Sequence, residues 1–296
     1  MQYNTRFAPS PTGPYIHIGN IRTAYFNWLA ARSTQSNFTL RIDDTDQNRH
    51  QEDAVKVIYD SMEWLGLDYD VTFRQSDHKD LYNQCVEELL SNDLVYEDEG
   101  AIRLRTPDLP DNWHDEIAGD VKISIKDKES IDGLVLIKSD GNPTYHFSTV
   151  VDDAFSNINY IIRGNDHTSN TCKHIAIYLQ MQKCNGGFDF SIPKYAHVGL
   201  IHKNKKKMSK RDPDNSSSLL YYKDAGYSPD AILNFLLRLG WSHSDANYDS
   251  KFPLVDKEKA LTIFLNEGRM RSAPANFDQA KLDWLDKKYK NLTEGD

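Results

Sequence analysis

Two segments of this sequence combine residue types that suit the binding of phosphate groups. The first, RFAPSPTGPYIHIGN at residues 6–20, holds three prolines and two glycines and is followed by an amphipathic run. Proline fixes φ and glycine tolerates positive φ, so the segment predicts a shaped loop between a strand and a helix. The start of a helix offers amide groups and the positive end of a dipole to a phosphate. His17, Gly19 and Asn20 are therefore candidate phosphate ligands, although a plain strand-to-helix turn can produce such a pattern as well.

The second segment, KNKKKMSKR at residues 203–211, is the most basic run of the chain, with five lysines and one arginine. Such a run is usually a solvated loop. Here it directly follows a predicted strand, and this position favours a mobile lid over a polyphosphate. Lys207, Ser209 and Lys210 are the candidate contacts to a triphosphate and to a leaving pyrophosphate.

The elements predicted around these segments alternate between strand and helix. Phe38, Leu40 and Ile42 alternate with polar residues, as in a strand, whereas apolar residues recur at helical spacing across 51–65. Predicted strands cover residues 2–7, 37–44, 71–73, 159–163 and 194–202, and predicted helices cover 21–32, 51–65, the region around 81–89 and a segment that ends near 182. This order is typical of a parallel sheet with crossover helices, so we expect an α/β fold that is Rossmann-like.

Three carboxylates, Asp43, Asp44 and Asp46, lie at and just beyond the end of the strand at 37–44. The carboxyl ends of parallel strands face the ligand in folds of this kind, so these side chains are candidates for substrate contacts. An acidic turn that caps the following helix explains the same pattern.

The region 91–140 interrupts the alternation. It contains Pro107 and Pro110 and short β-like segments with the sequences AIRLR, VKISI and LVLIK. These features indicate a small insertion of strands and turns between the two halves of the sheet.

Beyond residue 211 the pattern becomes helical. Ser228, Pro229 and Gly240 are typical of the cap, the first position and the end of a helix. Further helices are predicted at 257–265 and 278–290.

Composition narrows the class of protein. The net charge of −9 argues against nonspecific coating of polyanions, and three cysteines are too few for a disulfide framework, so we expect a reducing cytoplasm. No run approaches the roughly 18 apolar residues that a membrane span needs, so no membrane contact is expected. His167, Cys172, His174 and Cys184 have a spacing that matches no common zinc pattern, so no structural zinc is expected.

The order of these motifs resembles the class I aminoacyl-tRNA synthetases, and among them most closely the glutamyl-tRNA synthetase family. The resemblance covers the chain almost from end to end. The segments that carry it are RFAPSPTGPYIHIGNIRTAYFNWLAAR, LRIDDTD, KSDGNPTYHFSTVVDDA, YIIRGNDHTSNT, KKMSKR, GYSPDAILNFLLRLGWS and APANFDQAKLDWL.

The resemblance implies a fold in three parts. A discontinuous Rossmann-like catalytic domain would span residues 1–78 and 138–205, and an inserted subdomain that binds the acceptor end of tRNA would span 79–137. The KMSKR loop and a helical stem-contact region would occupy 206–296. The anticodon-binding domain of longer relatives is expected to be absent, because the sequence stops soon after KLDWLDKKY.

The resemblance also implies a reaction and a partner. Glutamate and ATP with Mg²⁺ would form glutamyl-adenylate, whose glutamyl group passes to the 3′-terminal adenosine of tRNA. A glutamate–tRNA ligase of this kind would contact the acceptor arm of tRNA and act as a monomer.

The implied site residues fall into three groups. The catalytic residues would be His17, Lys207 and Lys210. The ATP-binding residues would be His17, Gly19, Asn20, Asn165, Lys207, Ser209 and Lys210. The glutamate-binding residues would be Arg6, Ala8, Ser10, Asp43, Tyr145 and Arg163, with the arginines facing carboxylates and Asp43 facing the ammonium group.

Several positions depart from the family pattern. Asp43 stands where the family usually has glutamate, Asn165 replaces a usual acidic residue, and Asn20 replaces a histidine. The inserted segment lacks the C-x-C element of many relatives. Two alternatives stay open: a glutamyl-queuosine tRNA(Asp) synthetase, which is also short, and a catalytically silent tRNA-binding module.

Overall fold

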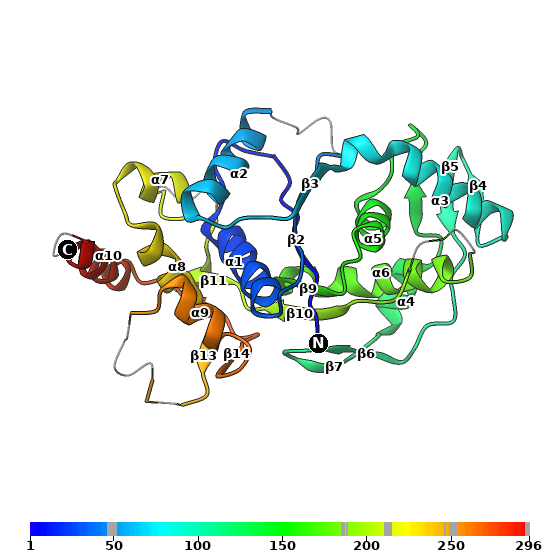
Figure 1. Ribbon diagram of the computed structural model, residues 1–296. Coiled ribbons are helices and arrows are strands. Elements are labelled where there is room, and N and C mark those ends of the chain that lie inside the picture. Colours follow the sequence, from blue (N-terminus) through cyan, green and yellow to red (C-terminus); the bar gives the residue numbers. More distant parts are fainter. Residues whose placement is uncertain are drawn as a thin grey trace.

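The protein is described by a computed structural model that covers residues 1–45, 52–184, 187, 189–209, 215–245, 247–248 and 254–293. Parallel strands β1 (Thr5–Phe7), β2 (Phe38–Ile42) and β3 (Val71–Arg74) form one sheet. A second sheet has the order β7 (Gly119–Lys122), β6 (Asn112–Asp115), β10 (Lys194–Val198) and β9 (Tyr160–Gly164). In Figure 1 strands β2, β9 and β10 lie at the centre of the molecule, and β6 and β7 lie along its lower edge.

The two sheets meet between β1 and β9. The carbonyl of Asn4, just before β1, accepts hydrogen bonds from the amides of Asn159 and Tyr160 at 3.1 and 3.2 Å. The resulting spatial order is β3-β2-β1-β9-β10, in which the direction of chain progression reverses between β1 and β9. This is the strand order of a Rossmann fold, and it confirms the predicted fold class.

Helices cover both sides of the strands, and all five residues of β2 are buried, with Phe38, Leu40 and Ile42 on one face and Thr39 and Arg41 on the other. One core gathers α1 (Ile18–Ser33), α2 (Glu52–Leu65), α8 (Pro229–Arg238), α9 (Lys257–Ile263) and α10 (Gln279–Thr293). The other gathers α3 (Lys79–Ser91), α4 (Ile125–Ile131), α5 (Tyr145–Phe155) and α6 (Thr168–Met181). Figure 1 shows α1, α2, α8 and α9 to the left of the strands and the second group to the right.

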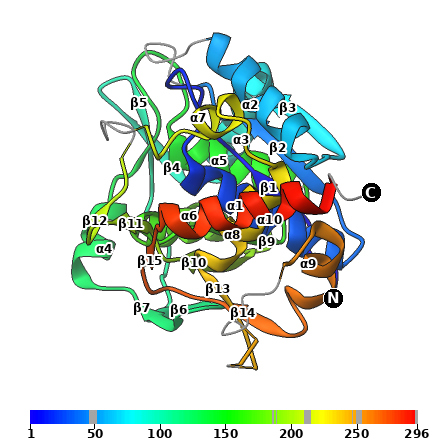
Figure 2. The ribbon, with the colours of Figure 1, turned by 90° about the vertical axis from the view of Figure 1, so that its left-hand side faces the viewer.

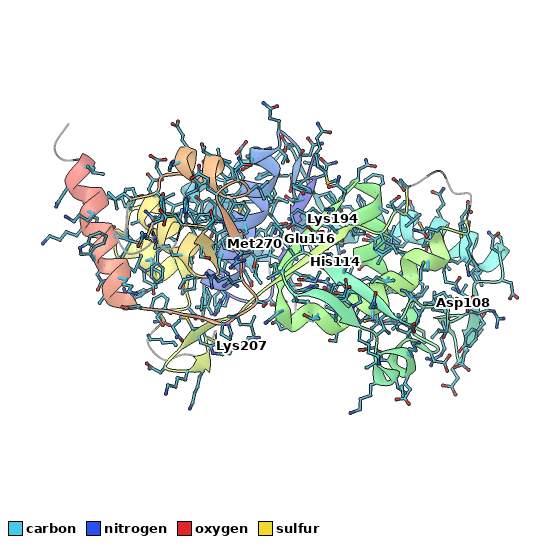
Figure 3. The ribbon with its side chains drawn as sticks, turned by 90° about the horizontal axis from the view of Figure 1, so that it is seen from below. Asp108, His114, Glu116, Lys194, Lys207 and Met270 are labelled. Carbon is cyan, nitrogen blue, oxygen red and sulfur yellow. The ribbon has the colours of Figure 1, made fainter. Side chains whose placement is uncertain are left out.

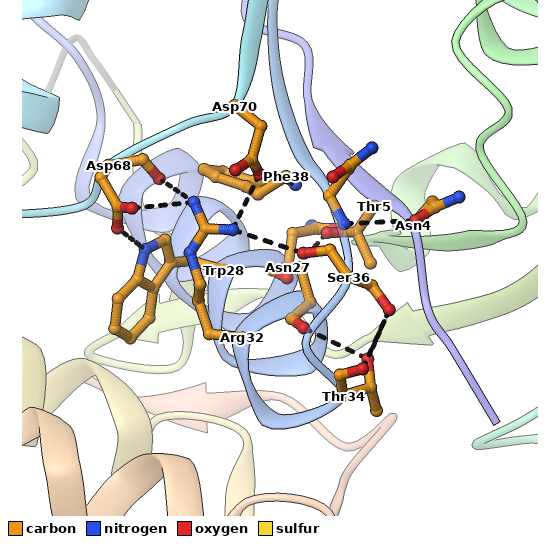
Figure 4. Close-up of polar contacts among 12 residues, drawn as sticks. Asn4, Thr5, Asn27, Trp28, Arg32, Thr34, Ser36, Phe38, Asp68 and Asp70 are labelled. Atoms are coloured by element: carbon orange, nitrogen blue, oxygen red, sulfur yellow. Dashed lines mark hydrogen bonds and ion pairs between the residues drawn. The ribbon is translucent and has the colours of Figure 1, made fainter.

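The C-terminal end of α1 is anchored by the polar network in Figure 4. The indole of Trp28 donates to Asp68 at 2.8 Å, and Arg32 forms ion pairs with Asp68 and Asp70 at 2.9 and 2.8 Å. Asp70 also accepts from the amide of Phe38 at 2.7 Å. These contacts join α1 to the chain before β3 and to the start of β2, so the opposite end of α1 is held at a fixed place beside the sheet.

The region predicted as an insertion divides into two parts. β4 (Val95–Asp98), β5 (Ala101–Leu104) and β8 (Val135–Ile137) form a small antiparallel sheet. The hairpin β6–β7 instead extends the central sheet, since β6 lies parallel to β10 and the amide of Glu116 donates to the carbonyl of Tyr195 at 2.8 Å. The segment VKISI was expected to be a strand, but only its start lies in β7; Ser124 caps the short helix α4 in a capping box.

The C-terminal part of the chain is less purely helical than expected. Beside α7 (Leu219–Asp224) and the longer helices it contains β13 (Trp241–His243), β14 (Gly268–Met270) and β15 (Ala275–Asn276). β15 pairs with β11 (Ile201–Lys203), which also pairs with β12 (Lys206–Lys207). In Figure 2 α10 crosses in front, with β11, β12 and β15 together at the left. Among the described helices, none is long and apolar enough to cross a membrane.

Candidate active site

A cavity of about 630 Å³ opens at the carboxyl ends of β1, β2 and β9. This is where the strand order reverses, and the loops that follow neighbouring strands there diverge and leave room for a ligand. The predicted site residues that line the cavity are Arg6, Ala8, Ser10, His17, Gly19, Asn20, Asp43, Tyr145, Arg163, Lys207 and Ser209. Two other predicted residues are not placed there. Asn165 is outside the lining, and Lys210 lies outside the described residues, as does Arg211.

His17 is the N-cap of α1, which begins at Ile18, three residues before the predicted start of that helix. Its ring Nδ1 accepts from the amide of Gly19 at 2.9 Å, and its carbonyl accepts from the amide of Asn20 at 2.8 Å. A Cβ on Gly19 would lie 3.0 Å from the imidazole, a tight contact that would press on the ring where it folds back. The expectation that these two amides face a phosphate needs correction, because both already donate within the cap.

The two described carboxylates after β2 have separate surroundings. Asp43 lines the cavity and accepts from Nε of Arg41 at 2.7 Å. Asp44 is buried and accepts from the amide and the hydroxyl of Ser76, both at 2.8 Å. Asp46 lies outside the described residues. Of the two that are described, Asp43 is therefore the one that can touch a ligand, while Asp44 joins β2 to the turn after β3.

Buried charges lie beneath the cavity. The carboxylate of Asp153 accepts from Arg6 at 3.1 Å and from Arg41 at 2.7 Å, and all three side chains are nearly inaccessible to solvent. Although burial alone would raise the pKa of Asp153, the two guanidinium groups hold it below its usual value. For Asp43 burial dominates, and its pKa is raised to about 6. Arg6 thus reaches the cavity with part of its charge already balanced.

Arg163, at the end of β9, has different partners. Its Nε donates to His197 Nε2 at 3.0 Å and its NH2 to the hydroxyl of Thr171 at 2.7 Å. The guanidinium also lies over the ring of Tyr195, 5.4 Å from the ring centre. Among the described residues no carboxylate forms an ion pair with Arg163, although it is only 5% exposed. Its positive charge is therefore available to an anionic ligand.

Imidazoles surround this arginine. His146 and His167 each have a pKa lowered to about 4, first by burial and then by neighbouring cations that include Arg163. Burial and Arg163 also lower the pKa of His174, which lies 3.4 Å from the guanidinium. These rings are neutral at neutral pH, so they add no competing positive charge. Tyr145 stands beside them, with its hydroxyl 3.5 Å from His167 Nδ1.

Lys207 reaches the cavity from the β11–β12 hairpin. The hairpin turns at Asn204 and Lys205, which have φ values of 52° and 65°. Such left-handed values are those of a two-residue turn that matches the twist of the strands. The Nζ of Lys207 lies 2.9 Å from Asp166, a cavity residue directly after β9. The part of the basic run up to Lys207 is thus a strand pair rather than an open loop.

The break between β10 and β11 depends on Gly199. A Cβ there would lie 2.0 Å from the carbonyl oxygen of Ala273, so only glycine allows the C-terminal segment to pass this close. Arg22 reinforces the junction, because its guanidinium donates to the carbonyls of Gly199 and Leu239 at 2.6 Å each. The hairpin with Lys207 is therefore positioned by the C-terminal part of the chain as well as by the sheet.

Asn165 lies outside the cavity, and three residues that were not predicted lie in or beneath it. The side-chain amide of Asn165 donates to the carbonyl of Ser272 at 3.4 Å, outside the cavity. Its neighbour Asp166 lines the cavity instead, as does Arg41, and Asp153 holds Arg41 from below. Sequence reasoning missed these three, although each lies in or beside a motif that it quoted. Within the described ranges, no group of three or more His, Cys, Asp or Glu side chains could hold a metal ion.

Comparisons with known proteins agree with this geometry. The family profile described as tRNA synthetases class I (E and Q), catalytic domain, matches residues 2–101 and 96–284. The chain is 37% identical, over 96% of its length, to glutamate–tRNA ligase 2 of Campylobacter concisus and to the glutamate–tRNA ligase of Burkholderia mallei. It covers 67% and 66% of those proteins, so it spans about two thirds of the length of these relatives.

A solved structure gives the same result. A glutamate tRNA ligase from Elizabethkingia meningosepticum, crystallised with its amino acid, superimposes with a TM-score of 0.82 and 27% identity, over 99% of this chain and 70% of that one. These names do not favour the two alternative functions. The chain belongs to the class I tRNA synthetases for glutamate and glutamine, and it contains their catalytic domain.

Proposed function

We propose that this chain activates L-glutamate with ATP and transfers the glutamyl group to the 3′-terminal adenosine of a tRNA. The observation that carries the proposal is the state of Arg163: a buried cation in the cavity, surrounded by neutral imidazoles and hydroxyls. An acidic amino acid supplies the missing negative charge, and a planar guanidinium matches a carboxylate in two parallel hydrogen bonds. The names of the relatives point to the same substrate.

On the glutamate side we assign the side-chain carboxylate to Arg163, with Tyr145 beside it. Arg6, whose charge is shared with Asp153, would take the second carboxylate, near Ser10 and the backbone of Ala8. Asp43 would accept from the ammonium group. Its oxygens accept from Arg41 at 2.7 and 3.4 Å, and each carboxylate oxygen has a second lone pair for a ligand.

On the nucleotide side we assign the phosphates to the region between the α1 N-terminus and the β11–β12 hairpin. His17, Gly19 and Asn20 line one wall there, and Lys207 and Ser209 line the other. Lys210 stays a proposed contact from the family motif alone.

Lys207 would exchange its contact with Asp166 for a phosphate oxygen, since its side chain is 57% exposed and free to turn. Mg²⁺ would arrive on the ATP phosphates. We assign it no protein ligand.

The chemistry then needs little more than alignment. An α-carboxylate oxygen of glutamate attacks the α-phosphorus of ATP, a new P–O bond forms, and the bond to pyrophosphate breaks. Because the negative charge that develops lies on phosphate oxygens, cations placed beforehand stabilise the transition state most. In the second step a ribose hydroxyl of the tRNA attacks the glutamyl carbonyl, and AMP leaves.

We also propose the division of labour along the chain. Residues 1–78 and 138–205 would form the catalytic domain and 206–296 the basic loop with the stem-contact region. Of the proposed acceptor-end subdomain at 79–137, the sheet β4-β5-β8 with α3 and α4 is the part that stands away from the central strands. The hairpin β6–β7 would instead serve the catalytic sheet, which it extends.

ATP–pyrophosphate exchange tests the activation step. Glutamate-dependent exchange is expected, measured both without and with total tRNA, because enzymes of this kind often activate glutamate only when tRNA is bound. Charging of total tRNA with labelled glutamate tests the transfer step. No exchange and no charging under either condition would refute the proposal. Acylation that occurs only on queuosine-containing tRNA, and persists when the 3′-terminal adenosine has been removed, would redirect it.

A further inference from the structure

A series of buried hydrogen bonds links Asp115, at the end of β6, to Arg163 in the cavity. Asp115 Oδ2 lies 2.7 Å from Nδ1 of His197, and Nε of Arg163 donates to Nε2 of the same ring at 3.0 Å. The three residues are 1%, 2% and 5% exposed. We propose that Asp115 and His197 are positioning residues that hold the guanidinium of Arg163 in the orientation that selects glutamate. This inference rests on the proposed function, in which Arg163 binds the side-chain carboxylate.

The bonding pattern decides where the proton of His197 lies. An arginine Nε can only donate, so Nε2 of the ring must offer its lone pair, and Nδ1 carries the proton that is donated to Asp115. A protonated ring would instead set two N–H groups against each other. Burial lowers the pKa of His197, Asp115 raises it and Arg163 lowers it again, and the net pKa is below the ordinary value. The ring is therefore neutral, in a single tautomer, at neutral pH.

Asp115 is itself held rigidly. Besides the ring, its Oδ2 accepts from the backbone amide of His197 at 3.0 Å, and its Oδ1 accepts from the amides of Ile117 and Ala118 at 2.9 and 2.8 Å. Burial alone would raise the pKa of Asp115, but the hydrogen bonds outweigh burial and the pKa lies below its usual value. The carboxylate is therefore an ionised acceptor with one fixed direction, as a tautomer-selecting partner must be.

The strand geometry explains why Asp115, and neither of its neighbours in sequence, faces the ring of His197. Side chains alternate along β6, so Asp115 is buried between the exposed His114 and Glu116. Figure 3 labels both neighbours on the underside of the molecule, near Lys194, to which Glu116 is ion-paired at 3.2 Å. Glu116 is thus a carboxylate next in sequence to Asp115 that faces away from His197, and it provides a matched control.

The arrangement leaves one side of Arg163 for a ligand. The contacts to His197 and Thr171 are short, at 3.0 and 2.7 Å, and they fix Nε and NH2. The contacts of NH2 to the carbonyl of His167 and of NH1 to His174 are long, at 3.3 and 3.4 Å. Long hydrogen bonds are weak and easily exchanged. A ligand carboxylate can replace these two long contacts, and it then binds a guanidinium whose orientation His197 and Thr171 have already fixed.

The test compares Asp115→Asn with Glu116→Gln in ATP–pyrophosphate exchange. An asparagine amide facing Nδ1 favours the opposite tautomer, as in the serine-protease triad, and the ring N–H would then oppose the Nε–H of Arg163. For Asp115→Asn we expect the KM for glutamate to rise roughly 10- to 100-fold, with the KM for ATP unchanged and the preference for glutamate over glutamine reduced. Glu116→Gln should behave like the wild type. Equal effects of the two variants, or a KM for glutamate within twofold of wild type in Asp115→Asn, would overturn the proposal.

A second measurement does not depend on activity. Nitrogen-15 NMR of the histidine side chains should show His197 as the neutral Nδ1–H tautomer in the wild type and not in Asp115→Asn. An unchanged tautomer refutes the role of Asp115 even if the protein proves inactive, so failure of the inference and failure of the proposed function are distinguishable.

A third comparison covers the case in which Asp115→Asn does not fold. His197→Gln keeps an acceptor for Arg163 and should retain glutamate selectivity, whereas His197→Leu should lose it. Equal selectivity in both variants would contradict the positioning role.

Discussion

The ammonium group of Lys207 lies 2.9 Å from the carboxylate of Asp166. This contact joins the β11–β12 hairpin to the end of β9, so a cation of the basic segment is already directed at the cavity where the nucleotide phosphates are proposed to bind. A phosphate oxygen that competes for Lys207 meets a nearly preformed position, because the lysine has only to turn from one acceptor to another.

We therefore predict that Lys207→Ala lowers the rate of glutamate-dependent ATP–pyrophosphate exchange by about 10²-fold or more, the usual cost of removing a group that stabilises developing charge. The KM for glutamate should change little, since Lys207 lies on the nucleotide side. Lys206→Ala, in the exposed neighbour on β12, is the control and should keep the wild-type rate. A loss of the same size in both variants would mean that only the general charge of the hairpin matters.

Arg163 leads to a prediction about selectivity. Arg163→Gln should lower kcat/KM for glutamate by about 10²- to 10³-fold, because a desolvated carboxylate loses its charged partner. The discrimination against glutamine should fall by a similar factor. Arg103→Gln, in an arginine of β5 that pairs with Asp98, serves as the control for a lost surface charge. If Arg163→Gln still prefers glutamate strongly, Arg163 is not the selecting group.

Asp43 predicts an acid limit for glutamate activation. Burial raises its pKa to about 6, so it is ionised above pH 6 and increasingly protonated below it. A protonated carboxyl accepts poorly from an ammonium group, and kcat/KM for glutamate should therefore fall as the pH drops through about 6. In Asp43→Asn, kcat/KM for glutamate, measured between pH 5 and 8, should be low and should not fall further below pH 6. If kcat/KM falls below pH 6 in the variant as it does in the wild type, a group other than Asp43 is responsible for the pH dependence.

The histidines near Arg163 predict a loss of stability in acid. The folded-state pKa values of His146 and His167 are about 4, below the ordinary value of 6.5, so the unfolded chain binds more protons between pH 4 and 6.5. Stability must then rise with pH across this window, by up to about 1.4 kcal/mol for each pKa unit of each group. The raised pKa of Asp43 opposes this trend below pH 6, but it is one group against several.

Urea unfolding at several pH values measures this dependence. Removing one of the groups, as in His146→Asn, should reduce the slope of the unfolding free energy between pH 4 and 6.5. A slope equal to that of the wild type would show that His146 titrates normally in the folded protein.

The buried carboxylate of Asp153 predicts a large loss of stability. Asp153→Ala leaves Arg6 and Arg41 without their shared partner, and breaking a buried ion pair from one side costs about 3–5 kcal/mol. Asp60→Ala removes a carboxylate from an exposed pair with Lys56 and should cost less than about 1 kcal/mol. Denaturant midpoints measure both. A cost for Asp153→Ala as small as for Asp60→Ala would contradict the view that these charges support the cavity.

Local patterns predicted most elements because each depends on neighbours in the chain. The alternation in β2, the helical spacing in α2 and the proline and glycine positions of residues 6–20 determine local geometry directly, and the structure agrees within a few residues. The alternation of strand and helix predicted parallel strands, whereas their order came from the structure. The position of the hairpin β6–β7 could not be predicted. Pro107 and Pro110 come just before the short strand β6, and the place of β6 depends on its pairing with β10.

The sequence by itself indicated the family and the fold class, and most of the site residues that it predicted line the cavity, since those features reside in motifs of contiguous residues. Only the tertiary structure decided how charge is distributed among them. It pairs Arg6 and Arg41 with Asp153 but leaves Arg163 with neutral partners, and it brings Asp115 from a distant hairpin to His197. Hydrogen bonds and burial act over a few ångströms in space. Arg6 and Asp153 are 147 residues apart in the sequence, so the sequence does not reveal that they are in contact.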